Sequence, residues 1–349
     1  MSNPSSSPQQ PPPPIPRVTG AAITHPGRVR SSNEDALYFG TLHAGLTLTE
    51  PLLRELPAGE PWMLLVADGM GGHLAGERAS REVADALSAT SPFTPPAVDT
   101  ALRDSNRSLI TAGQNDPSCR GMGATVAGLA CGPEGLFAFS VGDARVYRRQ
   151  DEFLTQISRD DSVAEVLVAA GHISREDLRP NSLHALTQSI GGRTHYADIR
   201  PHLYPLRLTA PTRFLLCTDG LTDTLTLDEI ELILNSSREP KTAVDRLFLC
   251  TMKGGAKDNI TIIVADVGDD SMSVSTRESA DEATPVSGAR GSAEPWRPAS
   301  LPERPSSARP PATPAPPTGG VNDDGDDDVD AAPDTEPGEH PHQPGFGED

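Results

Sequence analysis

Short apolar runs recur through the middle of the chain, each bounded by turn-forming residues. They lie at Trp62–Ala67, Thr125–Leu129, Leu136–Val141, Phe214–Cys217 and Ile260–Ala265. Their length and their content of β-branched and aromatic residues are typical of buried strands rather than of helices. We therefore predict several strands here, joined in hairpin pairs.

Stretches with helical spacing separate these runs. One apolar stripe recurs at i, i+4, i+7 and i+8, and consists of Ala79, Val83, Ala86 and Leu87. A similar stripe over Ser162–Ala170 predicts a helix that packs on the core, and Asp228 resembles the N-cap of a third helix. No internal repeat is present. A few helices beside paired strands favour an α+β fold over a β-α-β array.

The two ends of the chain differ from its middle in composition. Residues 1–17 contain seven prolines, and residues 271–349 contain 14 prolines and the acidic run Asp323 to Asp330. Segments so poor in apolar residues cannot bury enough surface to offset their ordering entropy. We therefore predict a disordered arm over 1–17, one folded domain over 18–267, and a disordered acidic tail over 268–349.

The acidic tail has two interpretations. It is an inert, solubilising extension, or it regulates the folded domain by competing for its site or by phosphorylation at residues such as Ser306, Ser307 and Thr313. Kinetics of a chain truncated at about residue 268 would separate the two.

Charge and cysteine content exclude several classes of protein. The formal net charge of −20 argues against nucleic acid or an anionic membrane as a partner. The four cysteines form no C-x-x-C pair, so a disulfide framework or a thiolate zinc site is not expected. The first residues do not resemble a secretory signal, and no run of 18 apolar residues occurs. We expect a soluble, cytoplasmic protein.

Carboxylates lie at the ends of five predicted strands. Asp68-Gly69, Asp219-Gly220 and Gly142-Asp143 follow strands, whereas Asp258-Asn259 and Glu34-Asp35 precede them. A strand end holds a carboxylate rigidly and leaves it open to solvent, and a neighbouring glycine lets the backbone approach a ligand. Hairpin loops also favour Asp and Gly, so each position taken alone could be an ordinary turn.

If these ends converge, like charges crowd together and a cation is needed to neutralise them. Oxygen ligands without cysteine select hard ions such as Mg²⁺ or Mn²⁺. Two such ions can clamp a water for in-line attack on phosphorus. The pattern therefore indicates phosphoryl chemistry at a site with two metal ions.

The motifs at these positions resemble those of the type-2C metal-dependent Ser/Thr protein phosphatases, the PPM family, in their bacterial form. Six motifs occur in the family's order and spacing: Arg30 to Asp35, Asp68-Gly69-Met70-Gly71-Gly72-His73, Gly121-Met122-Gly123-Ala124-Thr125, Gly142-Asp143-Ala144-Arg145, Asp219-Gly220-Leu221-Thr222-Asp223 and Gly255 to Thr261. They span the whole predicted domain. The resemblance implies an α-β-β-α sandwich, in which two antiparallel sheets are flanked by helices, with a binuclear Mn²⁺/Mg²⁺ centre at one edge.

The resemblance also implies a role for each motif residue. Asp68 would bridge both metals, and Asp35 and the Gly69 carbonyl would hold one of them, directly or through water. Asp219 and Asp258 would complete the other. Glu34 would fix metal-bound water, Asp143 matches a ligand of a weaker third metal, and Asp223 lies where a further contributor is found. Arg30 matches the arginine that holds the substrate phosphate, with Arg28 as the alternative.

The reaction implied is attack of a metal-bridging hydroxide on the phosphomonoester of phosphoserine or phosphothreonine. Phosphorylated proteins, either Ser/Thr kinases or their substrates, would be the partners. His73 competes with metal-bound water as the acid for the leaving group. Cys217 is expected to be a core residue, because no covalent phosphoenzyme is needed. The alternative function is a catalytically silent phosphoprotein-binding module of the same fold.

The resemblance is weakest over about 159–187, the family's flap. Asp160-Asp161-Ser162 replaces a frequent Asp-His-Ser, and Arg179-Pro180-Asn181-Ser182 replaces a frequent His-Pro-x-Arg. These departures bear on the third metal and on substrate preference, and they leave the binuclear centre unchanged.

Overall fold

The computed structural model describes residues 14–44, 47–71, 74–174 and 185–268. All of these belong to the first of the two units into which the chain divides, Met1–Pro285. The described strands begin at Val18 and end at Val267. Most of the predicted arm, all of the tail from residue 269, His73 and the segment Arg179–Ser182 lie outside the described residues. Ile15 and Pro16, which we placed in the arm, contact the folded part: Ile15 packs on the core, and Trp62 donates a hydrogen bond to the Pro16 carbonyl.

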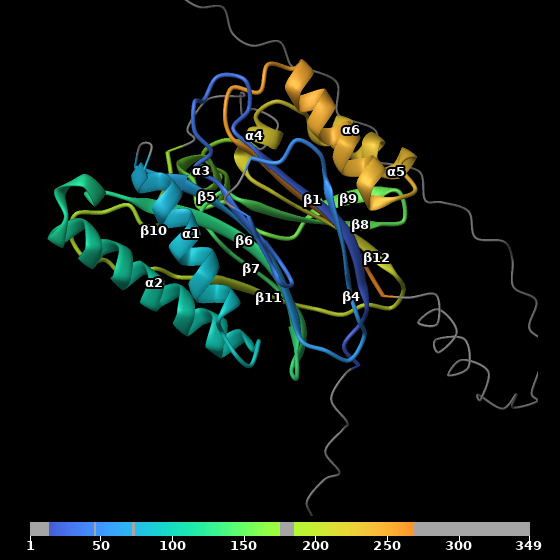
Figure 1. Ribbon diagram of the computed structural model, residues 1–349, viewed down its shortest axis with the longest axis horizontal. Helices are drawn as coiled ribbons and strands as arrows, with labels where there is room; N and C mark the ends of the chain where they lie inside the picture. The colour runs from blue at the N-terminus through green and yellow to red at the C-terminus, as the bar shows by residue number, and fades with distance from the viewer. Residues whose placement is uncertain (1–13, 45–46, 72–73, 175–184, 269–349) are drawn as a thin grey trace, which may run out of the picture. The chain divides into compact units, whose positions relative to one another are not determined.

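Two antiparallel sheets stack face to face between helices (Figure 1). One sheet has the order β4-β1-β13-β12-β8-β9, and the other has the order β11-β7-β6-β5-β2-β3, with β10 paired to β6. The strands are β1 (Val18–His25), β2 (Ala36–Phe39), β3 (Leu42–Ala44), β4 (Leu52–Leu56), β5 (Trp62–Met70), β6 (Gly123–Gly132), β7 (Gly135–Val141), β8 (Arg145–Gln150), β9 (Phe153–Gln156), β10 (Ile190–Gly191), β11 (His202–Leu206), β12 (Thr212–Cys217) and β13 (Ile260–Val267).

Helices cover the outer faces of both sheets. The helices of the described residues are α1 (Leu74–Ser88), α2 (Pro95–Asn115), α3 (Val163–Ala169), α4 (Asp219–Thr222), α5 (Leu227–Ser236) and α6 (Pro240–Lys253), with a 3₁₀ turn at Pro117–Cys119. Residues of α1 and α2 share a core cluster with β5, β6 and β7, whereas residues of α5 and α6 share one with β1, β12 and β13. The predicted α-β-β-α sandwich is confirmed.

The strand β5 illustrates why the central strands are apolar along their whole length. Met63 and Leu65 belong to the cluster beneath α1 and α2, while Leu64 and Val66 belong to the cluster between the sheets. Successive side chains of a strand point to opposite faces. A strand buried on both faces therefore needs an unbroken apolar run, and all five predicted runs form such strands.

Three details of the predicted helices are wrong. Ala86 is exposed on α1, and Ser80 and Ala84 are buried instead, so the buried stripe runs along a different side of the helix than the sequence indicates. The N-cap of α5 is Thr226, whose hydroxyl accepts from the backbone N–H of Glu229 in a capping box. Asp228 lies inside the first turn instead. The helix α3 is present, but none of its residues is buried, and Val166 is 50% exposed.

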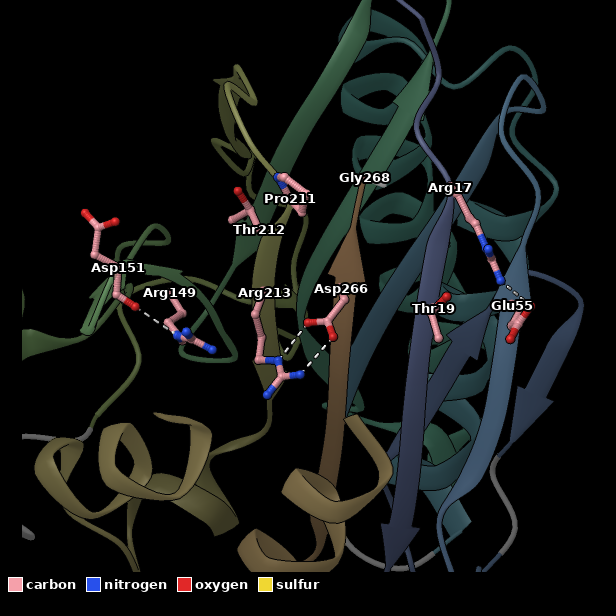
Figure 2. A pocket seen from close by; sticks show the side chains of 10 residues that line it. All are labelled: Arg17, Thr19, Glu55, Arg149, Asp151, Pro211, Thr212, Arg213, Asp266 and Gly268. Carbon is pink, nitrogen blue, oxygen red and sulfur yellow. Dashed lines mark hydrogen bonds and ion pairs between the residues drawn. The ribbon is translucent and has the colours of Figure 1, made fainter. Parts of the chain in front are cut away.

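Arg213 joins the sheet to the end of α5. It lies at the start of β12, and its guanidinium pairs with Asp266, its cross-strand neighbour on β13. The remaining N–H groups donate to the carbonyls of Leu234, Ser237 and Arg238, just where α5 ends. Figure 2 shows this pair on the wall of an open pocket of about 640 Å³. β12 runs from this end of the sheet toward Asp219, and the antiparallel strand β13 begins beside that other end, next to Asp258.

Candidate metal centre

A pocket of about 360 Å³ brings together almost every predicted site residue. Its walls are formed by Arg30, Glu34, Asp68, Gly69, Met70, Gly71, Thr125, Asp143, Leu186, Asp219, Asp223, Asp258 and Asn259. Asp35 is the exception, because it is fully buried. Its charge nevertheless raises the pKa of Asp68, so the two carboxylates are neighbours. Residues separated by more than 200 positions along the chain therefore meet in one cavity.

Each carboxylate is delivered by a different element of the fold. Asp68 lies within β5, paired with Thr125 of β6, and not beyond the strand's end as predicted. Asp143 lies in the turn between β7 and β8, and Asp219 begins α4. Asp258 lies two residues before β13. The site consequently forms where the ends of both sheets meet.

Gly69 has to be a glycine. A Cβ at this position would collide with the backbone carbonyls of Gly76 in α1 and of Glu34. Gly76 in turn leaves room for the Glu34 carboxylate, which a Cβ there would displace. Close approach of three backbone segments thus places Glu34 beside the pocket.

Hydroxyl groups hold one side of the Asp35 carboxylate. Its Oδ2 accepts hydrogen bonds from Thr218 Oγ1 at 2.8 Å and from Thr261 Oγ1 at 2.7 Å. Thr24 bonds to Thr261, and Asn33 donates to Thr24. This network fixes the orientation of the carboxylate, a role that supporting residues often have around metal ligands.

Two buried carboxylate oxygens have no partner among the described residues: Asp35 Oδ1 and Asp219 Oδ1. An unpaired buried acceptor is unfavourable unless a ligand or a water satisfies it. Burial, followed by the charges of neighbouring carboxylates, raises the pKa of Asp219 to about 8 and that of Asp68 well above its ordinary value. Burial likewise raises the pKa of Asp35 to about 7 and that of Asp143 to about 6.

These observations fit a divalent cation. No three His, Cys, Asp or Glu side chains in the described ranges are already grouped to hold an ion, so the carboxylates surround the pocket without converging on one point. Their donors are all oxygens, two of them buried and unpartnered, and their mutual repulsion opposes ionisation. Hard cations such as Mg²⁺ and Mn²⁺ would satisfy the unpartnered oxygens and relieve the repulsion, because they bind oxygen and neutralise charge.

Arg30 lies at the rim and pairs with Asp258, with Nη2 to Oδ2 at 2.7 Å. Its side chain is 53% exposed, and this pair strengthens the charged form and raises its pKa. The arginine predicted to bind phosphate is therefore held next to a predicted metal ligand.

Asn259 is a positioning residue whose role the sequence did not reveal. Its Oδ1 accepts from the Glu34 N–H, and its Nδ2 donates to the carbonyls of Pro26 and Ser32. It thereby ties the segment that carries Arg30 to the start of β13. The only signal in the sequence was its place directly after Asp258.

Thr125 belongs to one of the six motifs, but the sequence predicted no function for it. It lines the pocket beside Asp68, its cross-strand neighbour, and its buried hydroxyl has no partner in the described part of the chain. Such a hydroxyl can bond a water or a ligand oxygen in the cavity.

Cys217 and Asp223 lie before and after Asp219 in the chain, and the first is buried whereas the second is exposed. Asp223 ends α4 at the exposed rim of the pocket. Cys217 is completely buried, and burial raises the pKa of its thiol to about 12. A thiol so far from ionisation is a core residue and no nucleophile, as predicted.

No helix in the described part of the chain combines the length and the apolar character needed to cross a bilayer.

Comparisons with known proteins agree with this fold. The chain is 32% identical over 257 residues to the serine/threonine protein phosphatase PstP of Mycobacterium tuberculosis, covering 71% of this chain but only 45% of that protein. It is 29% identical over 252 residues to the serine/threonine phosphatase Stp of Listeria welshimeri, covering 70% of this chain and 93% of the relative. The chain thus spans less than half of the mycobacterial relative.

Solved structures match as well. Two crystal structures of PstP, the first of them described as from Mycobacterium tuberculosis, superpose with TM-scores of 0.59 and 0.57 at 30% identity, covering 72% of this chain and 100% of theirs. One of them contains the catalytic domain in complex with two manganese ions. The model of the protein phosphatase 2C family matches residues 55–259, which is more than half of the chain. With its sandwich of two sheets and its carboxylate-lined pocket, this chain belongs to the protein phosphatase 2C family, in its bacterial PPM form.

Proposed function

We propose that this protein is an Mn²⁺- or Mg²⁺-dependent protein serine/threonine phosphatase that hydrolyses phosphoserine and phosphothreonine monoesters. One observation carries the proposal: carboxylates from both sheets surround a single pocket, and among the described residues neither Asp219 Oδ1 of that pocket nor Oδ1 of the neighbouring buried Asp35 has a partner. Ser/Thr phosphatases are also the relatives that this chain matches. The partners we propose are phosphorylated proteins of a Ser/Thr kinase pathway in the cytoplasm.

The proposed metal ligands are the residues around the unpartnered oxygens. Asp68, Asp35, the Gly69 carbonyl, Asp219 and Asp258 would hold two ions, and Asp143, with Asp223 nearby, would contribute to a third. When bound, such ions would lower the pKa of a coordinated water and neutralise charge on the phosphoryl group.

The chain's own groups orient the substrate and its surroundings. Arg30 uses one N–H for Asp258 and has further donors on an exposed side chain, so it can grip phosphate oxygens. Asn259 keeps Glu34 and the Arg30 segment in place. Thr125 offers a hydroxyl to oxygens inside the cavity.

A phosphothreonine peptide assayed with and without Mn²⁺ tests the proposal. We expect release of phosphate that requires the added metal, stops with EDTA and returns when Mn²⁺ is restored. Turnover that does not depend on metal would contradict the proposed function. Binding of the peptide without hydrolysis would instead support the silent module.

Arg30→Ala is expected to raise KM for phosphate esters about ten- to hundredfold, because charge-assisted hydrogen bonds to phosphate are lost. The Mn²⁺ concentration for half-maximal activity should change much less. Steady-state kinetics at saturating metal measure both effects. The matched control is Arg28→Ala, since Arg28 is exposed and its side chain donates to the Met252 carbonyl, away from the pocket walls. An unchanged KM in Arg30→Ala removes its proposed role.

A further inference from the structure

We infer that Asp161 is a positioning residue for this reaction: it holds the turn that carries Asp143, together with the neighbouring wall of the pocket. The inference rests on the proposed function, because it concerns the ion that Asp143 would help to bind. Asp161 is not in the pocket itself. It acts through Gly142, the residue before Asp143.

The Asp161 carboxylate contacts three different segments through hydrogen bonds. Its Oδ2 accepts from the Gly142 N–H at 2.9 Å and from Gln188 Nε2 at 2.8 Å. Its Oδ1 lies 2.9 Å from His202 Nε2 on β11. The side chain is only 12% exposed. Hydrogen bonds to an ionised acceptor are stronger than those between neutral groups, and shielding from water preserves them.

The backbone of Asp161 adds two more bonds. Its N–H donates to the Gly142 carbonyl at 2.8 Å, and its carbonyl accepts from the Thr187 N–H at 2.8 Å. Ser162 and Leu186 pair next to it as an isolated bridge, and Leu186 lines the pocket. Asp161 therefore connects the turn at Gly142 to the chain that forms the neighbouring wall.

The bond from Asp161 affects Asp143 because the backbone at Gly142 is tightly constrained. Gly142 has φ +96°, a conformation that residues with a side chain rarely adopt, and a Cβ there would collide with the Thr125 side chain. Gly142 is thus confined between Thr125 on one side and Asp161 on the other. Since Asp143 follows directly, the bond from Asp161 sets where its carboxylate enters the pocket.

The neighbouring Asp160 anchors the other side of the same turn. Its carboxylate binds Arg145 through both Nε and Nη2, and Gln156 donates to it as well. Asp143 is thereby fixed from both directions. Of the two aspartates, Asp161 is the one whose backbone bonds Thr187, the residue after the pocket-lining Leu186, and we assign the positioning role to it.

A carboxylate suits this position because each of the three groups that face it can act as a donor. Asparagine in place of Asp161 could preserve two of the bonds, since a single amide oxygen can accept from both Gly142 and Gln188 while the NH₂ group faces the His202 ring nitrogen. Alanine preserves none. Asp161→Asn and Asp161→Ala therefore form an informative pair.

Calorimetric titration of Mn²⁺ into the full-length chain tests the inference. For Asp161→Ala we expect about a tenfold loss of affinity for the weakest-bound ion, about 1.4 kcal/mol, with the tighter binding unchanged. Asp161→Asn should stay within about threefold of the wild type at all sites. The matched control is Asp198→Ala, which removes a carboxylate that accepts from the Tyr196 hydroxyl and does not line the pocket; it should change nothing.

A double-mutant cycle with Asp143→Asn separates positioning from general loosening. Adding Asp161→Ala to Asp143→Asn should cause no further loss, because the affected ligand is already gone. Additive losses, equal losses at every site, or wild-type affinity in Asp161→Ala would each overturn the inference. If the alanine variant does not fold, Asp161→Ser, too short to reach Gly142 and His202 together, is expected to show the same loss. Absence of Mn²⁺ binding by the wild type would instead refute the proposed function.

Discussion

Asp68→Asn is expected to lower Mn²⁺-dependent hydrolysis of p-nitrophenyl phosphate by about a thousandfold, the scale of losing a central electrostatic group in an active site. Asp68 lies between the carboxylates of both sheets, and its pKa is raised by burial and then by Asp35 and Asp219. Replacing it removes the charge that two cations would share. Asp219→Asn should have the same effect, and retained activity in either variant would contradict the site.

The fold should survive these changes, and stability against pH provides the control. The folded-state pKa of Asp219 is about 8, above its ordinary value of 3.8, because of burial and the neighbouring carboxylates. The protonated form therefore stabilises the metal-free protein at low pH, and this stability is lost as the pH rises from about 4 to about 8. Asparagine does not titrate, so metal-free Asp219→Asn should melt at a higher temperature than the wild type at pH 8. Asp228→Asn, an exposed substitution on α5, should match the wild type in activity and stability.

Arg213→Ala is expected to lower the free energy of unfolding by about 3 kcal/mol, the lower end of the cost of breaking a buried ion pair. Arg213 is only 6% exposed, and its loss leaves three carbonyls near the end of α5 without this donor. Its partner Asp266 is 36% exposed, so water partly compensates that carboxylate. Urea denaturation followed by circular dichroism measures the change.

Arg149 provides the control for this substitution. It is the cross-strand neighbour of Arg213 on β8, but its guanidinium donates to the nearby Asp151 carbonyl in an exposed contact. Arg149→Ala should therefore cost less than about 1 kcal/mol. Arg213→Lys should be intermediate, because an ammonium cannot reproduce the planar set of donors. Equal midpoints for Arg213→Ala and the wild type would exclude the proposed contribution.

The sequence predicted the elements whose signal is local. Buried strands were recognisable from their apolar runs, because both faces of each are covered. Their bounds depend on more than the local signal: Asp68 and Gly69 disfavour strands by propensity, and only their pairing with β6 keeps them in β5. Pro95 and Pro240, which would interrupt a helix in its interior, begin α2 and α6, where a missing N–H has no consequence. Neither helix was predicted.

The carboxylates of the candidate site could be predicted from the sequence, but the residues that orient them by hydrogen bonds could not. Each of the four carboxylates lies beside glycine, asparagine or another acidic residue at a strand boundary: Asp35, Asp68, Asp219 and Asp258. This pattern involves only neighbouring residues, so it can be recognised in the sequence. The partners that orient them come from elsewhere in the chain. Thr218 lies 183 positions from Asp35, and no local pattern connects the two.

When Asp35 is ionised, the hydroxyls around it can be arranged in only one sense. Thr261 has a single hydroxyl proton, and it is committed to Asp35 Oδ2. Thr24 must therefore donate to Thr261, just as the Asn33 amide donates to Thr24. Each of these dipoles consequently points its positive end toward the carboxylate. A row of neutral groups that begins on β1 therefore stabilises the buried anion electrostatically. Within the described residues, the hydrogen bonds to this carboxylate come from threonines alone.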